Sequence, residues 1–137
     1  MTPLDLYHQG IAVIPIMPRD KKAAISWQRY THTLPREQQV RSWFRPGSTL
    51  NAAAVTGWRG WTVLDFDDYP KYVAWCIWCL TEGPAIARLS RDTYKVRTAR
   101  GMHVYFFVQD TPRCGKFSGG DIKGKGGYVL IPPSIHP

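Results

Sequence analysis

The chain has 137 residues, enough for one domain with a real hydrophobic core and too few for two. Its apolar fraction of 44% and charged fraction of 20% are ordinary for a globular protein. Eighteen Lys and Arg against ten Asp and Glu give a net charge of +8, which favours a polyanionic partner.

Neither a secretory signal nor a membrane span is visible in the sequence. Residues 1–5 lack a basic stretch followed by an apolar one, and the longest apolar run, 72–80, is far shorter than the roughly 20 residues that cross a bilayer. The cysteine count of three is odd, predicts no disulfide framework and suits a reducing cytosol. We therefore expect a cytoplasmic protein without a membrane partner.

The first half of the chain predicts short helices and strands in alternation. A helix at 4–9 ends at Gly10, a β-branched strand follows at 11–16, and a loop at 17–30 leads to a helix at 35–44. Residues 52–55 and 61–65 are predicted to be paired strands, because the turn between them has a glycine near each end.

The second half predicts one helix and several short strands. Residues 69–80 indicate a buried helix, which Gly83 and Pro84 end. Strands are expected at 85–89, 94–97, 103–108 and 128–131. The whole pattern predicts a single α+β domain over residues 1–137, with mixed or antiparallel pairing.

Cys76 and Cys79 form a C-x-x-C inside the predicted helix. A zinc site would need two more ligands at suitable spacing, and the sequence supplies no recognisable second half. Buried cysteine usually behaves as a small hydrophobic residue, and we expect that role here.

The stretch Thr62-Val63-Leu64-Asp65-Phe66-Asp67-Asp68 is an apolar strand that ends in alternating carboxylates. Side chains two apart on a strand share a face, so Asp65 and Asp67 point the same way. Two like charges held that close favour a divalent cation between them. A solvated acidic loop is the alternative for the pair alone, and Asp68, just before Tyr69 and Pro70, is typical of a helix cap.

Two further segments carry candidate chemistry. His103 follows Gly101 and opens an apolar strand, where a lone histidine is usually structural. Asp121 lies in a glycine-rich segment, 118–127, whose backbone could approach a ligand closely and cradle phosphate. Basic residues gather near both segments.

In order, the chain presents D-x-D after an apolar strand, G-x-H before another, G-G-D-x-K-G-x-G-G-Y, and a terminal P-P-S-x-H. This order resembles the primase-polymerase family (PrimPol, bifunctional DNA primase/polymerase) of the archaeo-eukaryotic primase superfamily. The resemblance covers nearly the whole chain and includes Lys22 with Trp27, then Trp43, Asn51 and Thr56-Gly57.

The resemblance implies a role for each matching residue. Asp65, Asp67 and Asp121 would be catalytic carboxylates that hold two ions of Mg²⁺ or Mn²⁺, and His103 would be a catalytic residue that contacts the phosphates of the incoming nucleotide. The implied fold pairs an RNA-recognition-motif-like sheet with an amino-terminal α/β module, and the active site lies in the cleft between them.

Other side chains are weaker candidates. Arg100, Lys123 and Lys22 are hypothesised phosphate contacts. Ser134 and His136 match the terminal motif and could line the nucleotide pocket. Trp58 and Arg59 could bind nucleic acid, because an exposed aromatic ring beside a basic residue can stack on a template base.

The sequence departs from the family pattern in two places. Gly101 stands where relatives often have Ser, which removes one hydroxyl contact to phosphate. The chain also stops at Pro137, where relatives usually continue and often extend into a helicase, so we expect a carboxy-terminally truncated domain with a helicase or accessory domain among its partners.

The sequence thus predicts a template-dependent nucleotidyltransferase, a DNA primase or polymerase acting in the replication of a plasmid, virus or other mobile element. Its partners would be single-stranded or primed DNA and nucleoside triphosphates. The alternatives are a nucleic-acid-binding module that has kept the fold without the activity, and another metal-dependent D-x-D transferase.

Overall fold

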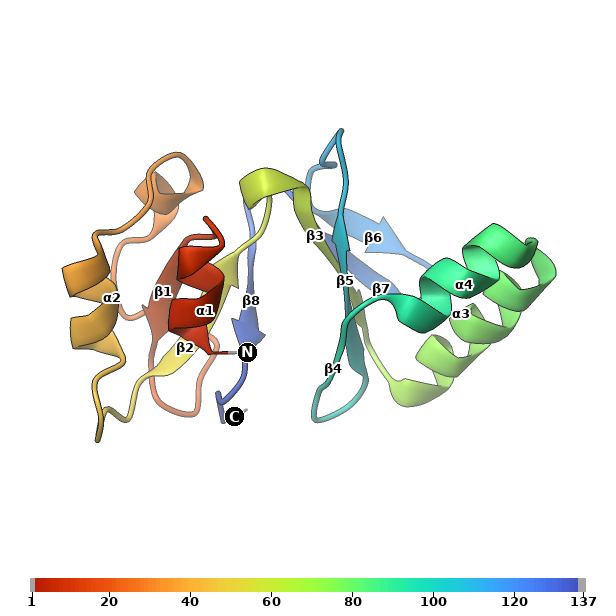
Figure 1. Ribbon diagram of the computed structural model, residues 1–137. Helices are drawn as coiled ribbons and strands as arrows, with labels where there is room; N and C mark the ends of the chain where they lie inside the picture. Colours follow the sequence, from red (N-terminus) through yellow and green to blue (C-terminus); the bar gives the residue numbers. More distant parts are fainter. Residues whose placement is uncertain (1, 136–137) are drawn as a thin grey trace.

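The computed structural model of the chain describes residues 2–135. Its strands form two antiparallel sheets, of three and five strands, which lie beside one another (Figure 1). Helices α1 (Pro3–His8) and α2 (Glu37–Trp43) flank the smaller sheet, and α3 (Tyr69–Thr81) and α4 (Pro84–Asp92) flank the larger one. None of the helices within residues 2–135 has the length and apolar character that a bilayer crossing requires.

The smaller sheet has the strand order β1-β2-β8. Its strands are β1 (Val13–Ile16), β2 (Asn51–Val55) and β8 (Tyr128–Ile131). Every residue of β1 and β2 is buried, because α1 and α2 cover one face and the loop that contains the 3₁₀ helix η1 (Gln28–Thr31) covers the other. The first described element, α1, and the last, β8, thus belong to one compact module.

The larger sheet has the strand order β4-β5-β3-β7-β6. Its strands are β3 (Trp61–Phe66), β4 (Lys95–Arg97), β5 (Met102–Phe107), β6 (Gly115–Phe117) and β7 (Gly120–Lys123). The α3–α4 pair lies on the outer side of this sheet, away from the smaller one (Figure 1).

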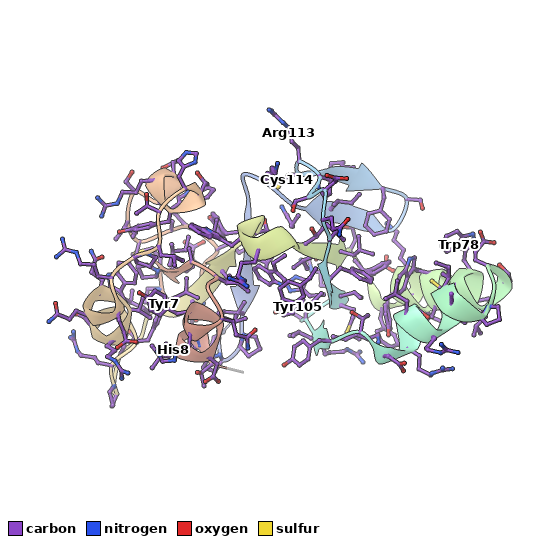
Figure 2. The ribbon with its side chains drawn as sticks, turned by 45° about the horizontal axis from the view of Figure 1, so that its top comes forward. Tyr7, His8, Trp78, Tyr105, Arg113 and Cys114 are labelled. Atoms are coloured by element: carbon purple, nitrogen blue, oxygen red, sulfur yellow. The ribbon has the colours of Figure 1, made fainter. Side chains whose placement is uncertain are left out.

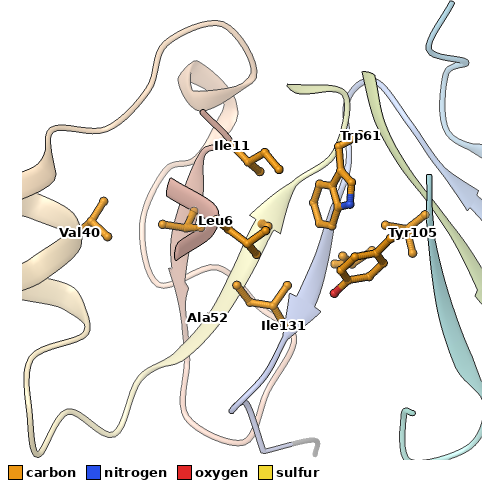
Figure 3. Packing of buried hydrophobic residues seen from close by; sticks show 11 residues of the cluster. Leu6, Ile11, Val40, Ala52, Trp61, Tyr105 and Ile131 are labelled. Atoms are coloured by element: carbon orange, nitrogen blue, oxygen red, sulfur yellow. The ribbon is translucent and has the colours of Figure 1, made fainter. Parts of the chain in front are cut away.

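One apolar cluster joins the two sheets. Trp61, Val63 and Tyr105 of the larger sheet pack with Val129 and Ile131 of β8 (Figure 3). Trp61 is fully buried, and its ring meets that of Tyr105 edge to face at a centroid distance of 5.1 Å. Such a pair adds a directional contribution to the area that it buries, so it fixes one sheet against the other.

The predicted hairpin between residues 52–55 and 61–65 is wrong. β2 pairs with β1 and β8, whereas β3 pairs with β5 and β7, so the two strands belong to different sheets. Between them the 3₁₀ turn η2 (Trp58–Gly60) redirects the chain. The predicted turn is present, but turn residues do not determine which strands pair at long range.

Thr56 ties together the two places where the chain crosses between sheets. Its buried hydroxyl donates to the Gly124 carbonyl, and its backbone N–H donates to the Gly127 carbonyl at 3.0 Å. Residues 56–60 lead from β2 to β3, and residues 124–127 lead from β7 back to β8. One buried threonine therefore holds both connections at a fixed spacing.

Two predictions about the outer layer are also wrong. Residues 85–89 are part of helix α4, because Pro84 suits a first turn and the chain then buries Ser90. Helix α3 is not buried: Ile77 is 58% exposed, Trp78 52% and Leu80 66% (Figure 2). Only one side of α3 contacts the sheet and α4, so much of its apolar surface faces outward.

Candidate active site

Alternation along β3 places its carboxylate on the inner face of the larger sheet. Leu64 and Phe66 pack toward α3 on the outer face. Trp61 and Val63 face the smaller sheet, and Asp65, two residues beyond Val63, continues their side of the strand. The apolar side chains of this inner face are packed against the smaller sheet. Asp65, near the end of the strand, lies beyond that packed region.

Four side chains form a row across the larger sheet. Asp65 is paired with His103 of β5 on one side and with Asp121 of β7 on the other. Asp121 is paired in turn with Lys116 of the edge strand β6. Directly opposed residues of antiparallel strands share a face, with Cβ atoms about 4.5–5.5 Å apart. The order of the row is therefore His103, Asp65, Asp121, Lys116.

Two glycines allow the flanking strands to approach β3 where the row forms. A Cβ atom on Gly101 would lie 2.1 Å from the Phe66 carbonyl oxygen, and one on Gly120 would lie 2.0 Å from that of Asp65. Real Cβ atoms do not come so close to backbone. The G-x-H and G-G-D motifs thus have a packing reason as well as a chemical one.

Asp67 and Asp68 follow β3 and have different roles. The Asp68 carboxylate accepts from the Lys71 N–H at 2.8 Å, which confirms that Asp68 caps helix α3. The Lys71 ammonium lies 3.4 Å from a carboxylate oxygen of Asp67. The start of α3 therefore holds both side chains just beyond the row.

Each of the three predicted metal carboxylates has a nitrogen neighbour. His103 Nε2 lies 3.3 Å from Asp65 Oδ1, and Lys116 Nζ lies 2.8 Å from Asp121 Oδ1. The hydrogen bond from Lys116 lowers the pKa of Asp121 below its usual range, and the same bond raises the pKa of Lys116. The carboxylates therefore already sit among positive or protonatable groups.

His103 is almost completely buried, at 5% exposure. Its Nδ1 is one of two buried side-chain nitrogen or oxygen atoms without a hydrogen-bond partner among the described residues. An unsatisfied buried polar atom is costly, and such atoms are often found at functional sites.

The row opens into a pocket of about 750 Å³ between the two sheets. Asp65, Asp67, His103 and Asp121 all line it, and Arg100 and Lys123 line it with them. The remaining lining residues are Lys21, Trp27, Phe66, Thr98, Ala99, Gly126, Gly127, Tyr128, Val129 and Leu130. The structure thus gathers six of the predicted site residues around one cavity of ligand size.

A family model described as the N-terminal domain of bifunctional DNA primase/polymerases matches residues 3–137. The chain belongs to this family. No curated protein matches the chain. Membership in the primase/polymerase family implies an activity of the nucleotidyltransferase type, and it agrees with the mixed α+β fold and its antiparallel sheets.

The candidate site of this primase/polymerase domain contains donor atoms that suit a hard cation. Carboxylate oxygens are the ligands that Mg²⁺ and Mn²⁺ prefer, and Asp65 and Asp121 are close enough across the strands to share an ion. Among the described residues, no three acidic, histidine or cysteine side chains already converge as a ligand set. Lys71 and Lys116 each contact one oxygen, of Asp67 and Asp121 respectively, so a metal ion would compete with these lysines or use the second oxygen of each carboxylate.

Lys22 and Ser134 do not line the pocket of this primase/polymerase domain. Adjacent Lys21 lines it instead of Lys22. The Ser134 hydroxyl donates to the Ala52 carbonyl at 2.8 Å and accepts from the Ala52 N–H at 2.9 Å, so it extends the pairing on β2. His136, the other residue predicted from the terminal motif, lies outside the described residues.

Trp58 and Arg59 also lie away from the pocket. The Trp58 indole is half-buried against the core and donates to the Tyr30 carbonyl at 2.6 Å, so it is not a free stacking surface. Arg59 is exposed, and its side chain lies beside Gly10.

Among the lining residues that sequence reasoning did not predict are Lys21, Trp27, Thr98 and Tyr128. Trp27 and Tyr128 stand inside the segments that carry the family resemblance, yet nothing in their local sequence gives them a role. Thr98 accepts from the Gly101 N–H at 3.0 Å and thereby shapes the turn before His103. Its place two residues before Arg100, a predicted phosphate contact, is the sequence signal that could have indicated Thr98 as a pocket residue.

Proposed function

We propose that this domain is a template-dependent nucleotidyltransferase, a DNA primase or polymerase core. In the reaction, a primer-strand or initiating-nucleotide 3′-hydroxyl attacks the α-phosphate of a nucleoside triphosphate, the bond to the β-phosphate breaks, and pyrophosphate leaves. The observation that carries this proposal is that Asp65, Asp67, Asp121 and His103, from separate segments, line one pocket.

The three carboxylates would bind two Mg²⁺ or Mn²⁺ ions. When bound, such ions activate the attacking hydroxyl and stabilise the leaving pyrophosphate. Asp65 and Asp121 would supply oxygens from the centre of the sheet, and Asp67 would supply them from the start of α3. His103 is paired with Asp65 across the strands, and its Nε2 lies 3.3 Å from that carboxylate. It would orient Asp65 and contact the triphosphate.

Positive side chains at the pocket rim would neutralise the remaining phosphate charge. Arg100 and Lys123 line the pocket and are long enough to follow a triphosphate. The net charge of +8 would hold primed or single-stranded DNA through its phosphates. Binding of primed template should therefore weaken steeply as salt concentration rises.

The larger sheet would be the RNA-recognition-motif-like sheet of an archaeo-eukaryotic primase core. In support, β3, the α3–α4 pair, β4 and β5 follow one another along the chain, and β3 is central in the sheet. The smaller sheet with α1 and α2 would be the amino-terminal α/β module, and the pocket would be the cleft between them.

The decisive experiment measures incorporation on primed and unprimed single-stranded template, with deoxy- or ribonucleotides and with Mg²⁺ or Mn²⁺. Asp65→Asn and Asp121→Asn are expected to reduce incorporation by roughly 100-fold or more, the size of effect seen when one transition-state stabiliser is lost. Asp92→Asn is the matched control, because Asp92 is an exposed carboxylate on α4.

Retention of incorporation by both pocket variants would overturn the mechanism. Binding of primed template by the unaltered protein without any metal-dependent extension would instead identify a nucleic-acid-binding module of this fold. Extension of a primer without synthesis on unprimed template would identify a polymerase core that does not initiate chains.

A further inference from the structure

The pocket has an aromatic wall that the proposed chemistry does not use. Trp27 and Tyr128 both line the pocket, and both are half-buried. Their ring centroids are 4.9 Å apart with an interplanar angle of 80°, an edge-to-face contact. Neither ring is needed to hold metal or phosphate. The pair is therefore available to contact another part of a bound ligand.

The two rings are fixed in place from several sides. Both pack against the cluster on the loop-covered face of the smaller sheet. The Tyr128 hydroxyl donates to the Lys21 carbonyl at 2.7 Å, which ties β8 to the loop that carries Trp27. A pre-ordered aromatic surface loses little side-chain entropy when a ligand binds.

The pocket therefore has two unlike ends. One wall carries the carboxylates, His103 and Lys123 from the larger sheet. The other carries Trp27, Tyr128 and Leu130 from the smaller module, with Lys21 beside them. A matching ligand has a polyanionic end and a flat, largely apolar end. A nucleoside triphosphate has both, and a volume of about 750 Å³ is within the range of small-ligand sites.

We propose that Trp27, held by Tyr128, is the platform on which the base of the incoming nucleotide stacks. This inference rests on the proposed nucleotidyl transfer, and it deepens it by naming the residues that hold the base. Stacking uses the π-face that every base has, so the platform accepts all four nucleotides and leaves selection to the template. Purines, with the larger ring, gain more from it than pyrimidines.

The test compares dATP with inorganic tripolyphosphate, each with Mg²⁺, by isothermal titration calorimetry. The unaltered protein is expected to bind dATP about tenfold more tightly than tripolyphosphate, within the range that stacking on one aromatic ring provides. Trp27→Leu keeps an apolar side chain without a π-face. It should lower dATP affinity about tenfold and leave tripolyphosphate affinity unchanged.

Two further measurements separate stacking from a structural role. Trp27→Phe should keep dATP affinity within about threefold of the unaltered protein, because it retains a ring. The preference for dATP over dCTP should fall toward one in Trp27→Leu. Trp78→Leu is the matched control, since Trp78 is 52% exposed on α3 and does not line the pocket.

The outcomes distinguish the two proposals. If the unaltered protein binds neither dATP nor tripolyphosphate, the proposed function itself fails. If it binds both equally, or if Trp27→Leu binds dATP as tightly as the unaltered protein, the platform alone is wrong. A variant that binds dATP normally but single-stranded template more weakly would assign Trp27 to the template and overturn the nucleotide assignment.

Discussion

The two sheets are built from similar short antiparallel strands, yet they tolerate very different side chains. In the smaller sheet, β2 contributes Ala52, Ala53 and Ala54, all buried, and apolar clusters cover both of its faces. In the larger sheet, β3 is packed on its outer face and along part of its inner face, and its acidic end borders the pocket. One sheet therefore supplies a rigid wall, and the other carries the charge.

A carboxylate introduced into the smaller module should cost far more stability than one introduced beside the larger sheet. Ala53→Asp buries a carboxylate at a position with no exposure, and we expect a loss of several kcal/mol, enough to unfold the domain. Urea unfolding followed by circular dichroism measures it. Ala74→Asp, on the exposed side of α3, is the control and should cost less than about 1 kcal/mol. Equal losses would contradict the assignment of a rigid wall.

The close approach of Gly101 to β3 should also be important for stability. Gly101→Ala would drive a Cβ atom against the Phe66 carbonyl, and we expect a loss of about 3 kcal/mol together with a disturbed His103. Thermal unfolding and the His103 imidazole NMR signals report the two effects. Gly115→Ala, with nothing within 4 Å of its Cβ, should be neutral or slightly stabilising.

Ser134 tests whether the smaller sheet also provides a nucleotide contact. Ser134→Ala removes both hydrogen bonds to Ala52, and we expect a loss of about 1–2 kcal/mol of stability with nucleotide affinity unchanged. Chemical denaturation and nucleotide titration measure these separately. A large fall in nucleotide affinity with unchanged stability would show that Ser134 contacts the nucleotide.

Removal of the Lys116 charge should have a modest effect on metal binding by the charged row. Lys116→Gln removes an 86% exposed ammonium that competes for the Asp121 carboxylate, so Mn²⁺ affinity should rise about two- to fivefold. Electron paramagnetic resonance of free Mn²⁺ measures it. Lys22→Gln, which removes the same charge outside the pocket lining, is the control, and an unchanged affinity in Lys116→Gln would show that the lysine does not compete.

The same substitution has a pH signature in the metal-free protein. Lys116 lowers the pKa of Asp121, so this pair stabilises the fold above the ordinary value of 3.8 and the contribution is lost as pH falls through the lowered pKa. Lys116→Gln should move the Asp121 midpoint, followed by carboxyl ¹³C NMR, upward toward its ordinary value.

Much of the fold could be predicted from local sequence. The apolar runs of β3, β5 and β8 and the cap at Asp68 have clear signals. The β6–β7 hairpin was missed because a glycine-rich segment has low strand propensity, and here the glycines serve close packing against β3. Residues 85–89 were assigned to a strand because a short apolar run does not distinguish strand from helix.

The candidate site was predictable in its residues and only partly in its shape. Strand alternation predicts Asp65 and Asp67 as a pair, although β3 ends at Phe66. The places of Asp121 and His103, on either side of Asp65, depend on pairing across strands far apart in the chain. The family resemblance supplied that link. The aromatic wall could not be foreseen, because Trp27 reaches the pocket through a loop whose path is set by its contact with β8.

The alternation of β3 also limits how this chain can vary in length. Odd positions of the strand face the pocket or the joint between the sheets, and even positions face α3. A single-residue insertion inside the strand would exchange the two sets, turning the Phe66 ring from the outer apolar layer to the inner face and a carboxylate into the apolar layer. An insertion at the tip of the α3–α4 pair, by contrast, would change neither set. Length changes should therefore accumulate in the outer helices and be absent from β3.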